Sequence, residues 1–192
     1  MTTARVTGPA TLVVSLPEAK AHLRVDGSDE DSLITGLIRA AVAHFDGQGV
    51  LGRAMITQSW SQWFKQSPGV VRLRIGPFQS LTSVEFYDGD NALQTAMLSD
   101  YEIRLDGDFV NVRPKDGFSW PESYVRDDAI KITYVAGFGD TAADVPQSIR
   151  HAILMTVAHW YEHREAVAEG SFSELPMAVS ALLSVERVGW YG

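Results

Sequence analysis

Hydrophobic residues near the start of the chain recur at helical spacing. One apolar face runs through residues 28–47, where three- and four-residue steps separate Leu33, Ile34, Leu37, Ile38, Ala41, Val42 and Phe45. A shorter helix is predicted over residues 15–25, since Ser15, Pro17 and Glu18 offer an N-cap, an early proline and a capping-box acid. Asp26-Gly27 separates the two helices, and Ser28 offers the second N-cap.

The spacing then changes to short alternating runs rich in β-branched residues, which predict strands. The predicted strands cover residues 55–64, 70–75, 83–87, 91–97, 101–105, 109–113 and 129–136. Asp-Gly pairs at residues 88–89, 106–107 and 116–117 favour positive φ at hairpin ends. Several of these strands are therefore expected to be antiparallel neighbours.

Helical spacing returns after residue 139. Pro146 suits the first turn of a long helix that extends to about residue 165, and a last helix is predicted over residues 175–187 after a break near Gly170. The pattern predicts an α+β fold, in which a small helical bundle carries an antiparallel β-rich insert and a C-terminal docking helix. The expected parts are residues 1–53 (helical), 54–139 (β-rich) and 140–192 (C-terminal helices and tail).

Composition narrows the classes of function. The net charge of -8 and the pI near 5.0 argue against a general nucleic-acid binder, which needs clustered Lys and Arg. The chain has no cysteine, so only His, Asp and Glu remain as metal ligands. No apolar run approaches the roughly 20 residues of a membrane span, and the N-terminus lacks the features of a secretory signal. We therefore expect the protein to be in the cytoplasm before assembly and not to associate with a membrane.

One motif suggests zinc chemistry. His159 and His163 lie one helical turn apart with Glu162 between them, as in a zinc hydrolase. The same helix also has a stripe that predicts a buried face, formed by Ile149, Ile153, Thr156 and Trp160. Both histidines lie on the flank of this stripe. Helix-flank histidines are the favoured interpretation. A third ligand would have to come from Glu165, Glu169 or Glu174.

The remaining motifs give weaker evidence for a functional site. The Asp88 to Asn91 segment departs from a calcium loop and is interpreted as a hairpin turn. No phosphate-binding glycine loop or nucleophile elbow is present in the sequence. Trp60, Trp63 and Phe64 could stack on bases, but core packing is favoured, since the even spacing of Trp60 and Phe64 is that of one strand face in a core.

The C-terminal end is apolar and aromatic, which leaves two interpretations open. The last helix could fold back on its own core, or the helix and tail could occupy a groove on a partner. The residues concerned are Leu182, Leu183, Val185, Val188, Trp190 and Tyr191.

Several separated sets of residues form a longer pattern. They include the segments 16–24 (Leu-Pro-Glu-Ala-Lys-Ala-His-Leu-Arg), 52–58 (Gly-Arg-Ala-Met-Ile-Thr-Gln) and 134–139 (Tyr-Val-Ala-Gly-Phe-Gly). They continue with Asp26, Asp31, Pro77, Leu81, Val84, Tyr87, Asp88, Val145, Pro146, Ile149, Arg150, Ala152, Trp160, Tyr161, Pro176, Val179 and Arg187. In order and spacing this pattern resembles the head-tail connector (adaptor) proteins of long-tailed phages and of phage-derived gene transfer agents.

The resemblance implies a structural virion protein with no catalytic, metal or cofactor site. It implies a ring, commonly of twelve copies, between the portal protein and a stopper or tail-completion protein, with DNA passing through the channel. The C-terminal helix and tail would bind the portal through Leu182, Leu183, Val185, Arg187, Val188, Trp190 and Tyr191, and removal of residues 175–192 would leave a folded protein that no longer joins it. A zinc-dependent hydrolase and a monomeric carbohydrate- or protein-binding module are the alternatives.

Overall fold

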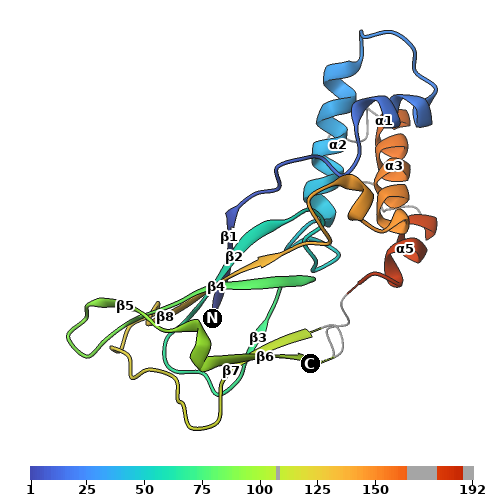
Figure 1. Cartoon of the computed structure of the whole chain (residues 1–192). Helices are drawn as coiled ribbons and strands as arrows, with labels where there is room; N and C mark the ends of the chain where they lie inside the picture. The colour runs from blue at the N-terminus through green and yellow to red at the C-terminus, as the bar shows by residue number, and fades with distance from the viewer. Residues whose placement is uncertain (107–108, 164–176, 188–192) are drawn as a thin grey trace. The chain divides into compact units, whose positions relative to one another are not determined.

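The chain folds into two compact units, each built from two segments of the sequence. The computed structural model describes residues 1–106, 109–163 and 177–187 (Figure 1). Met1–Ala10 and Thr57–Gly137 form the β unit, whereas Thr11–Ile56 and Phe138–Gly192 form the helical unit. In the described residues, no helix is long and apolar enough to cross a membrane. The α+β class predicted from the sequence is confirmed.

The helical unit packs its helices around one apolar core. The helices are α1 (Leu16–Leu23), α2 (Asp31–Phe45), α3 (Gln147–Glu162) and α5 (Met177–Ser184). Their fully buried side chains include Ala19, Ile34, Ile38, Ala41, Phe45, Ile149, Ile153, Val157, Val179 and Leu183. The apolar face predicted for the second helix is therefore confirmed for Ile34, Ile38 and Phe45, which are inaccessible to solvent, but not for Leu33, which is 40% exposed.

The first two helices differ in how they begin. Ser15 caps α1 as predicted, since its hydroxyl accepts a hydrogen bond from the backbone N–H of Glu18 at 3.3 Å. Ser28 does not cap α2, which begins three residues later. Its carbonyl instead closes a turn by accepting a hydrogen bond from the N–H of Asp31, whose carboxylate pairs with Lys20 at 2.6 Å.

The approach to α3 is tightly turned, with a short 3-10 helix, η2 (Ala142–Asp144), before it. The backbone N–H and the hydroxyl of Thr141 both donate to the carboxylate of Asp144, at 2.9 and 2.8 Å. These hydrogen bonds lower the pKa of Asp144, the backbone one most strongly. A side chain at Gly139 would place its Cβ 2.4 Å from the Asp144 Cγ, so this position requires glycine. Pro146 then stands as the N-cap of α3.

Two antiparallel sheets make up the β unit. The five-stranded sheet has the order β1-β2-β8-β4-β5 and the three-stranded sheet the order β3-β7-β6. Their bounds are β1 (Thr2–Thr7), β2 (Gln58–Phe64), β3 (Val71–Leu73), β4 (Phe78–Tyr87), β5 (Leu93–Thr95), β6 (Tyr101–Asp106), β7 (Phe109–Pro114) and β8 (Ile130–Ala136), with a 3-10 turn η1 (Leu98–Asp100) before β6. Inward-facing side chains of both sheets are buried: Trp60, Val71, Leu73, Val84, Val110, Val112, Ile130, Ile132 and Tyr134.

Two buried polar side chains connect the sheets. The amide of Gln62, on β2, donates to the carbonyl of Arg72 and accepts from the N–H of Arg74. The hydroxyl of Tyr134, on β8, accepts from the N–H of Ile75 at 3.1 Å and donates to the Gln62 side chain at 3.2 Å. Burial raises the pKa of Tyr134 to about 12. These bonds satisfy backbone groups that would otherwise be buried without a partner.

The structure adds to the sequence prediction at two places. Residues 2–7 form β1, the edge strand beside β2, so the first ten residues lie in the β unit and not in the helical part predicted for residues 1–53. Its sequence, Thr-Thr-Ala-Arg-Val-Thr, has too few large apolar residues to alternate visibly. Strand β4 begins at Phe78, five residues before the predicted start, because two irregularities in its ladder with β8 interrupt the alternation.

Candidate docking site

The last helix packs against its own unit. Val179 and Leu183, one turn apart on α5, are 0% and 2% exposed, and Leu182 is partly buried against the same core. Figure 1 shows α5 beside the beginning of α3. Of the two interpretations that the sequence left open, the structure shows the helix folded onto its own core.

The segment that follows α5 is held by hydrogen bonds from two other parts of the helical unit. Arg53 donates from Nε to the backbone carbonyl of Glu186 at 2.7 Å, and the Ser148 hydroxyl donates to the Glu186 carboxylate at 2.7 Å. The backbone N–H groups of Glu186 and Arg187 both donate to the carbonyl of Leu183. Glu186 is therefore fixed close to the first turn of α3.

Sequence reasoning missed this anchor. Glu186 is separated from its partners Arg53 and Ser148 by 133 and 38 residues, and no sequence motif contains all three. Only the fold brings them together. No local signal in the sequence could have found them.

The seven residues predicted to bind the portal have different environments. Leu183 is buried in the core and Leu182 is partly buried, so both hold α5 in place. Val185 is 83% exposed, and Arg187 is exposed beside it. Val188, Trp190 and Tyr191 lie outside the described residues. Within the described part, the surface open to a partner at this end therefore consists of an apolar side chain next to a positive charge.

The helix α3 carries the candidate zinc motif. Its predicted buried stripe is confirmed, since Ile149, Ile153 and Thr156 are inaccessible and Trp160 is nearly so. His159, partly exposed, and His163, exposed, have ring centroids 4.5 Å apart on the flank of this stripe.

Within the described residues, no third metal ligand joins this histidine pair. The His163 Nδ1 lies 2.9 Å from the backbone oxygen of His159. Among residues 1–106, 109–163 and 177–187, no group of three His, Asp or Glu residues could hold a metal ion. The third ligands considered, Glu165, Glu169 and Glu174, lie outside these ranges.

Comparison with known proteins gives one family match. Residues 13–68, which include α1, α2 and the whole of β2, match the family model of the phage gp6-like head-tail connector proteins. A search of curated proteins finds no relative. The resemblance inferred from the sequence is confirmed by this match.

Solved structures extend the likeness to both units. A chain of the neck of an empty gene transfer agent (GTA) particle, computed with C6 symmetry, is 21% identical with a TM-score of 0.77, and the alignment covers 98% of this chain and 96% of that one. A chain of the virion of a native GTA particle gives the same values. A chain of the neck of a native GTA particle with C12 symmetry is 17% identical over the same shares, with a TM-score of 0.70. The chain thus shares the fold of these proteins over nearly its whole length.

Proposed function

We propose that this protein is a structural head-tail adaptor, located in the neck of a phage-like particle. One observation carries the proposal: the shared fold extends through both units to chains from the necks of GTA particles. The connector-family match over residues 13–68 supports the same conclusion. The role is structural and not enzymatic, and the protein reaches the particle from the cytoplasm of the producing bacterium.

In this proposal the copies form a ring, with twelve as the expected number. The necks that contain the similar chains have C6 and C12 symmetry, and a twelvefold ring satisfies both. The ring would lie between the portal protein and a stopper or tail-completion protein.

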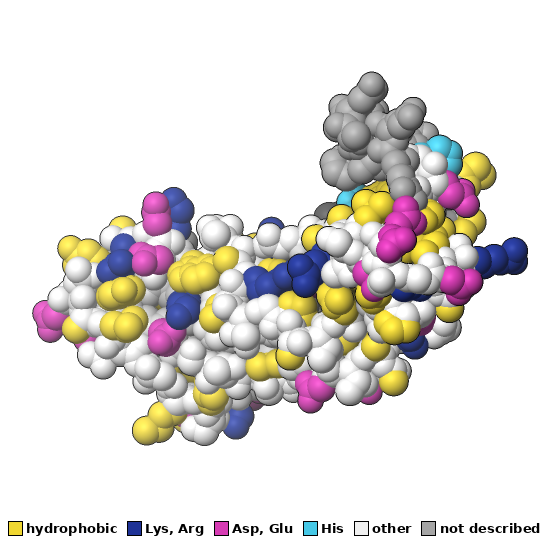
Figure 2. All heavy atoms as spheres, turned by 90° about the horizontal axis from the view of Figure 1, so that it is seen from above, with side chains coloured by type: hydrophobic (Ala, Val, Ile, Leu, Met, Phe, Trp, Pro, Cys, Tyr) yellow, Lys and Arg dark blue, Asp and Glu magenta, His cyan; other side chains and the backbone are white. Residues whose placement is uncertain are grey.

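Charge is consistent with a conduit. The chain has a net charge of -8, and Figure 2 shows acidic and basic side chains interspersed over the face that it presents. A wall of this kind lacks the clustered cations that hold phosphates, so DNA could pass through the channel without binding to it.

The portal contact is assigned to the segment that leaves α5. Val185 and Arg187 are the exposed members of the predicted set, and the segment is held in place by Arg53 and Ser148. Val188, Trp190 and Tyr191 would continue this contact, since Trp and Tyr are favoured as interface anchors. Leu182 and Leu183 would then contribute by positioning α5.

This assignment changes the deletion that tests it. Removal of residues 175–192 would take away Val179 and Leu183 and expose the core that they cover, so a folded product is no longer expected. Removal of residues 188–192 leaves α5 and its Glu186 anchor intact. The shorter deletion is therefore the informative one.

The experiment produces the chain together with the portal protein of its own particle. Negative-stain electron microscopy should show a ring of twelve copies attached to the portal. Val185→Asp and the deletion of residues 188–192 should each abolish attachment while the circular dichroism spectrum is retained. Met177→Asp is the matched control, because Met177 is 89% exposed at the opposite end of α5.

Two results would contradict the proposal at different levels. Particles that contain no ring of this chain would refute the adaptor function. Full attachment of both the Val185→Asp variant and the shortened chain would leave the adaptor function standing and refute the docking segment.

A further inference from the structure

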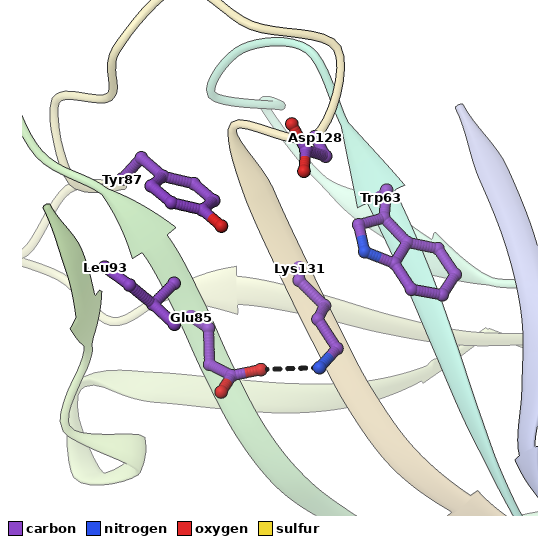
Figure 3. A pocket seen from close by; sticks show the side chains of 6 residues that line it. All are labelled: Trp63, Glu85, Tyr87, Leu93, Asp128 and Lys131. Carbon is purple, nitrogen blue, oxygen red and sulfur yellow. Dashed lines mark ion pairs between the residues drawn. The ribbon is translucent and has the colours of Figure 1, made fainter. Parts of the chain in front are cut away.

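A pocket opens on the outer face of the five-stranded sheet, within the β unit (Figure 3). Its volume is about 230 Å³. The side chains that line it come from four strands and from the loop before β8: Trp63, Glu85, Tyr87, Leu93, Asp128 and Lys131. This face is opposite to the one that meets the three-stranded sheet, because Trp63 and Lys131 alternate with the inward-facing Gln62 and Ile132.

Strand register brings these residues together. Lys131 on β8 is paired with Trp63 on β2 and with Glu85 on β4, so the three side chains form one row across the sheet. Tyr87, two residues further along β4, is paired with Leu93 on β5. In Figure 3 the two aromatic side chains lie on either side of Lys131. The pocket is therefore built on paired strands, which hold side chains more rigidly than a loop does.

The wall of the pocket is fixed by a network around Arg126. Its guanidinium donates to both carboxylate oxygens of Asp128, at 2.6 and 3.0 Å, and to the side-chain oxygen of Asn91 at 2.9 Å. The guanidinium carbon lies 3.5 Å from the centroid of the Tyr87 ring. The Tyr124 N–H also donates to the Tyr87 carbonyl, so the loop is attached to the hairpin of β4 and β5. Because these side chains are already ordered, less conformational entropy is lost when a ligand binds.

The charges in the pocket are balanced. Glu85 pairs with Lys131 at 2.9 Å, and Asp128 pairs with Arg126, which lowers the pKa of Asp128 chiefly through their hydrogen bond. Two carboxylates and two cations leave no net charge to attract an ion. They do offer both acceptors and donors to hydroxyl groups, and a neutral ligand can use them without separating a pair.

The apolar part of the pocket complements these groups. Trp63 and Tyr87 provide flat aromatic surfaces, and Leu93 adds an exposed apolar rim. A ligand suited to this pocket has one apolar face and a margin of hydroxyl groups, as a pyranose ring does. The volume lies below the range of pockets that enclose drug-sized molecules, so a single ring is the appropriate size.

We propose that this pocket binds one neutral sugar residue, the C–H face of its ring against Trp63 and its hydroxyl groups on Glu85, Lys131 and Asp128. The inference is independent of the adaptor function, because it rests only on the β unit. Affinity for a free monosaccharide should be weak, with a dissociation constant in the millimolar range, since the contact area is small.

The test is a two-dimensional ¹H–¹⁵N NMR titration of the full-length protein. The probes are the methyl glycosides of glucose, galactose, mannose and N-acetylglucosamine. The indole N–H signal of Trp63, assigned by its loss in Trp63→Phe, should shift saturably with at least one glycoside. In Trp63→Ala the remaining pocket signals should require at least tenfold more glycoside.

Trp120→Ala is the matched control. Trp120 lies in the same unit but outside the pocket, where its ring packs on Tyr101 and its indole N–H donates to the carbonyl of Gly69. The titration of the folded Trp120→Ala variant should equal that of the unchanged protein. A well-dispersed spectrum in each variant establishes that it is folded.

Three outcomes would overturn the proposal. The first is that none of the glycosides shifts the Trp63 indole signal. The second is a shift of equal size and midpoint in folded Trp63→Ala, read from the backbone signals of Glu85 and Lys131. The third is saturation by acetate or methylammonium in preference to the glycosides, which would show that the pocket selects an ion.

Discussion

Replacement of Leu183 by alanine tests whether α5 is a core helix of its own unit or a helix that needs a partner. The Leu183 side chain is 2% exposed and belongs to the same core cluster as Val179 and Ile149. The change removes three buried carbon atoms without introducing a polar group.

The expected cost follows from burial. Three buried carbons contribute about 2 kcal/mol of transfer free energy at about 0.8 kcal/mol each. The cavity that remains adds to this, and buried Leu→Ala replacements cost about 2–5 kcal/mol in total. We expect the free energy of unfolding of the helical unit to fall by about 3 kcal/mol.

Urea denaturation followed by circular dichroism at 222 nm measures this loss, because the described α-helices all lie in the helical unit. With a urea dependence of about 2 kcal/mol per molar, the midpoint should fall by about 1.5 M. The Val185→Ala variant is the control, since Val185 is 83% exposed and its truncation should change stability by less than about 0.5 kcal/mol.

Equal midpoints for the Leu183→Ala, Val185→Ala and unchanged proteins would refute the reasoning. Such a result would mean that α5 does not rest on α3 in solution. The interpretation in which the helix docks on a partner would then be restored, with Leu183 as one of its contacts.

Two further outcomes are expected. Tyr134→Phe should destabilise the β unit by about 1–3 kcal/mol, because the buried N–H of Ile75 loses its acceptor. Since the pKa of Tyr134 is raised from the ordinary 10.0 to about 12, absorbance titration should show a tyrosine ionisation near pH 12 that is absent from the variant, and stability should be lost between pH 10 and 12. Because the pKa of Asp144 is lowered, its hydrogen bonds from Thr141 stabilise the fold above about pH 3.8, and this stabilisation is lost as the pH falls further. Asp144→Asn should therefore reduce the difference between the urea midpoints measured at pH 7 and at pH 2.5.

The helices were predictable from the sequence because their signals are local. The Ser15 cap and the apolar spacing of α2 act within a few residues, and both are found in the structure. The hairpin of β4 and β5 was also foreseen from Asp88, whose carboxylate accepts hydrogen bonds from the N–H groups of Asp90 and Ala92. The positive φ of this turn falls on Asn91, not on the glycine of the Asp-Gly pair.

Features that depend on pairing between distant strands could not be predicted. Strand β1 is identified by its partner β2, more than fifty residues later, and not by its own composition. The row of Trp63, Lys131 and Glu85 likewise exists only through the register of three strands. In the sequence these three residues lie far apart and form no motif, and Trp63 was interpreted only as a core residue or a base-stacking residue.

The candidate docking site was predicted in part. The apolar character of the C-terminal end indicated that the segment packs against something, but composition does not distinguish a core from a partner. The structure shows two environments at this end of the chain, since Leu183 on α5 is buried while Val185, directly after the helix, is exposed.

The division of the chain has a consequence for its synthesis. Each unit is made of two segments, and the segments alternate, so that the chain passes from one unit to the other near residues 10, 56 and 137. On the ribosome, α1 and α2 emerge after β1 but before the other strands, and they remain without α3 until the whole β unit has been made. Strand β1 likewise has no pairing partner until β2 has been synthesised. Neither unit can therefore be completed as an early, independent folding product, and the apolar face of α2 is exposed for most of translation.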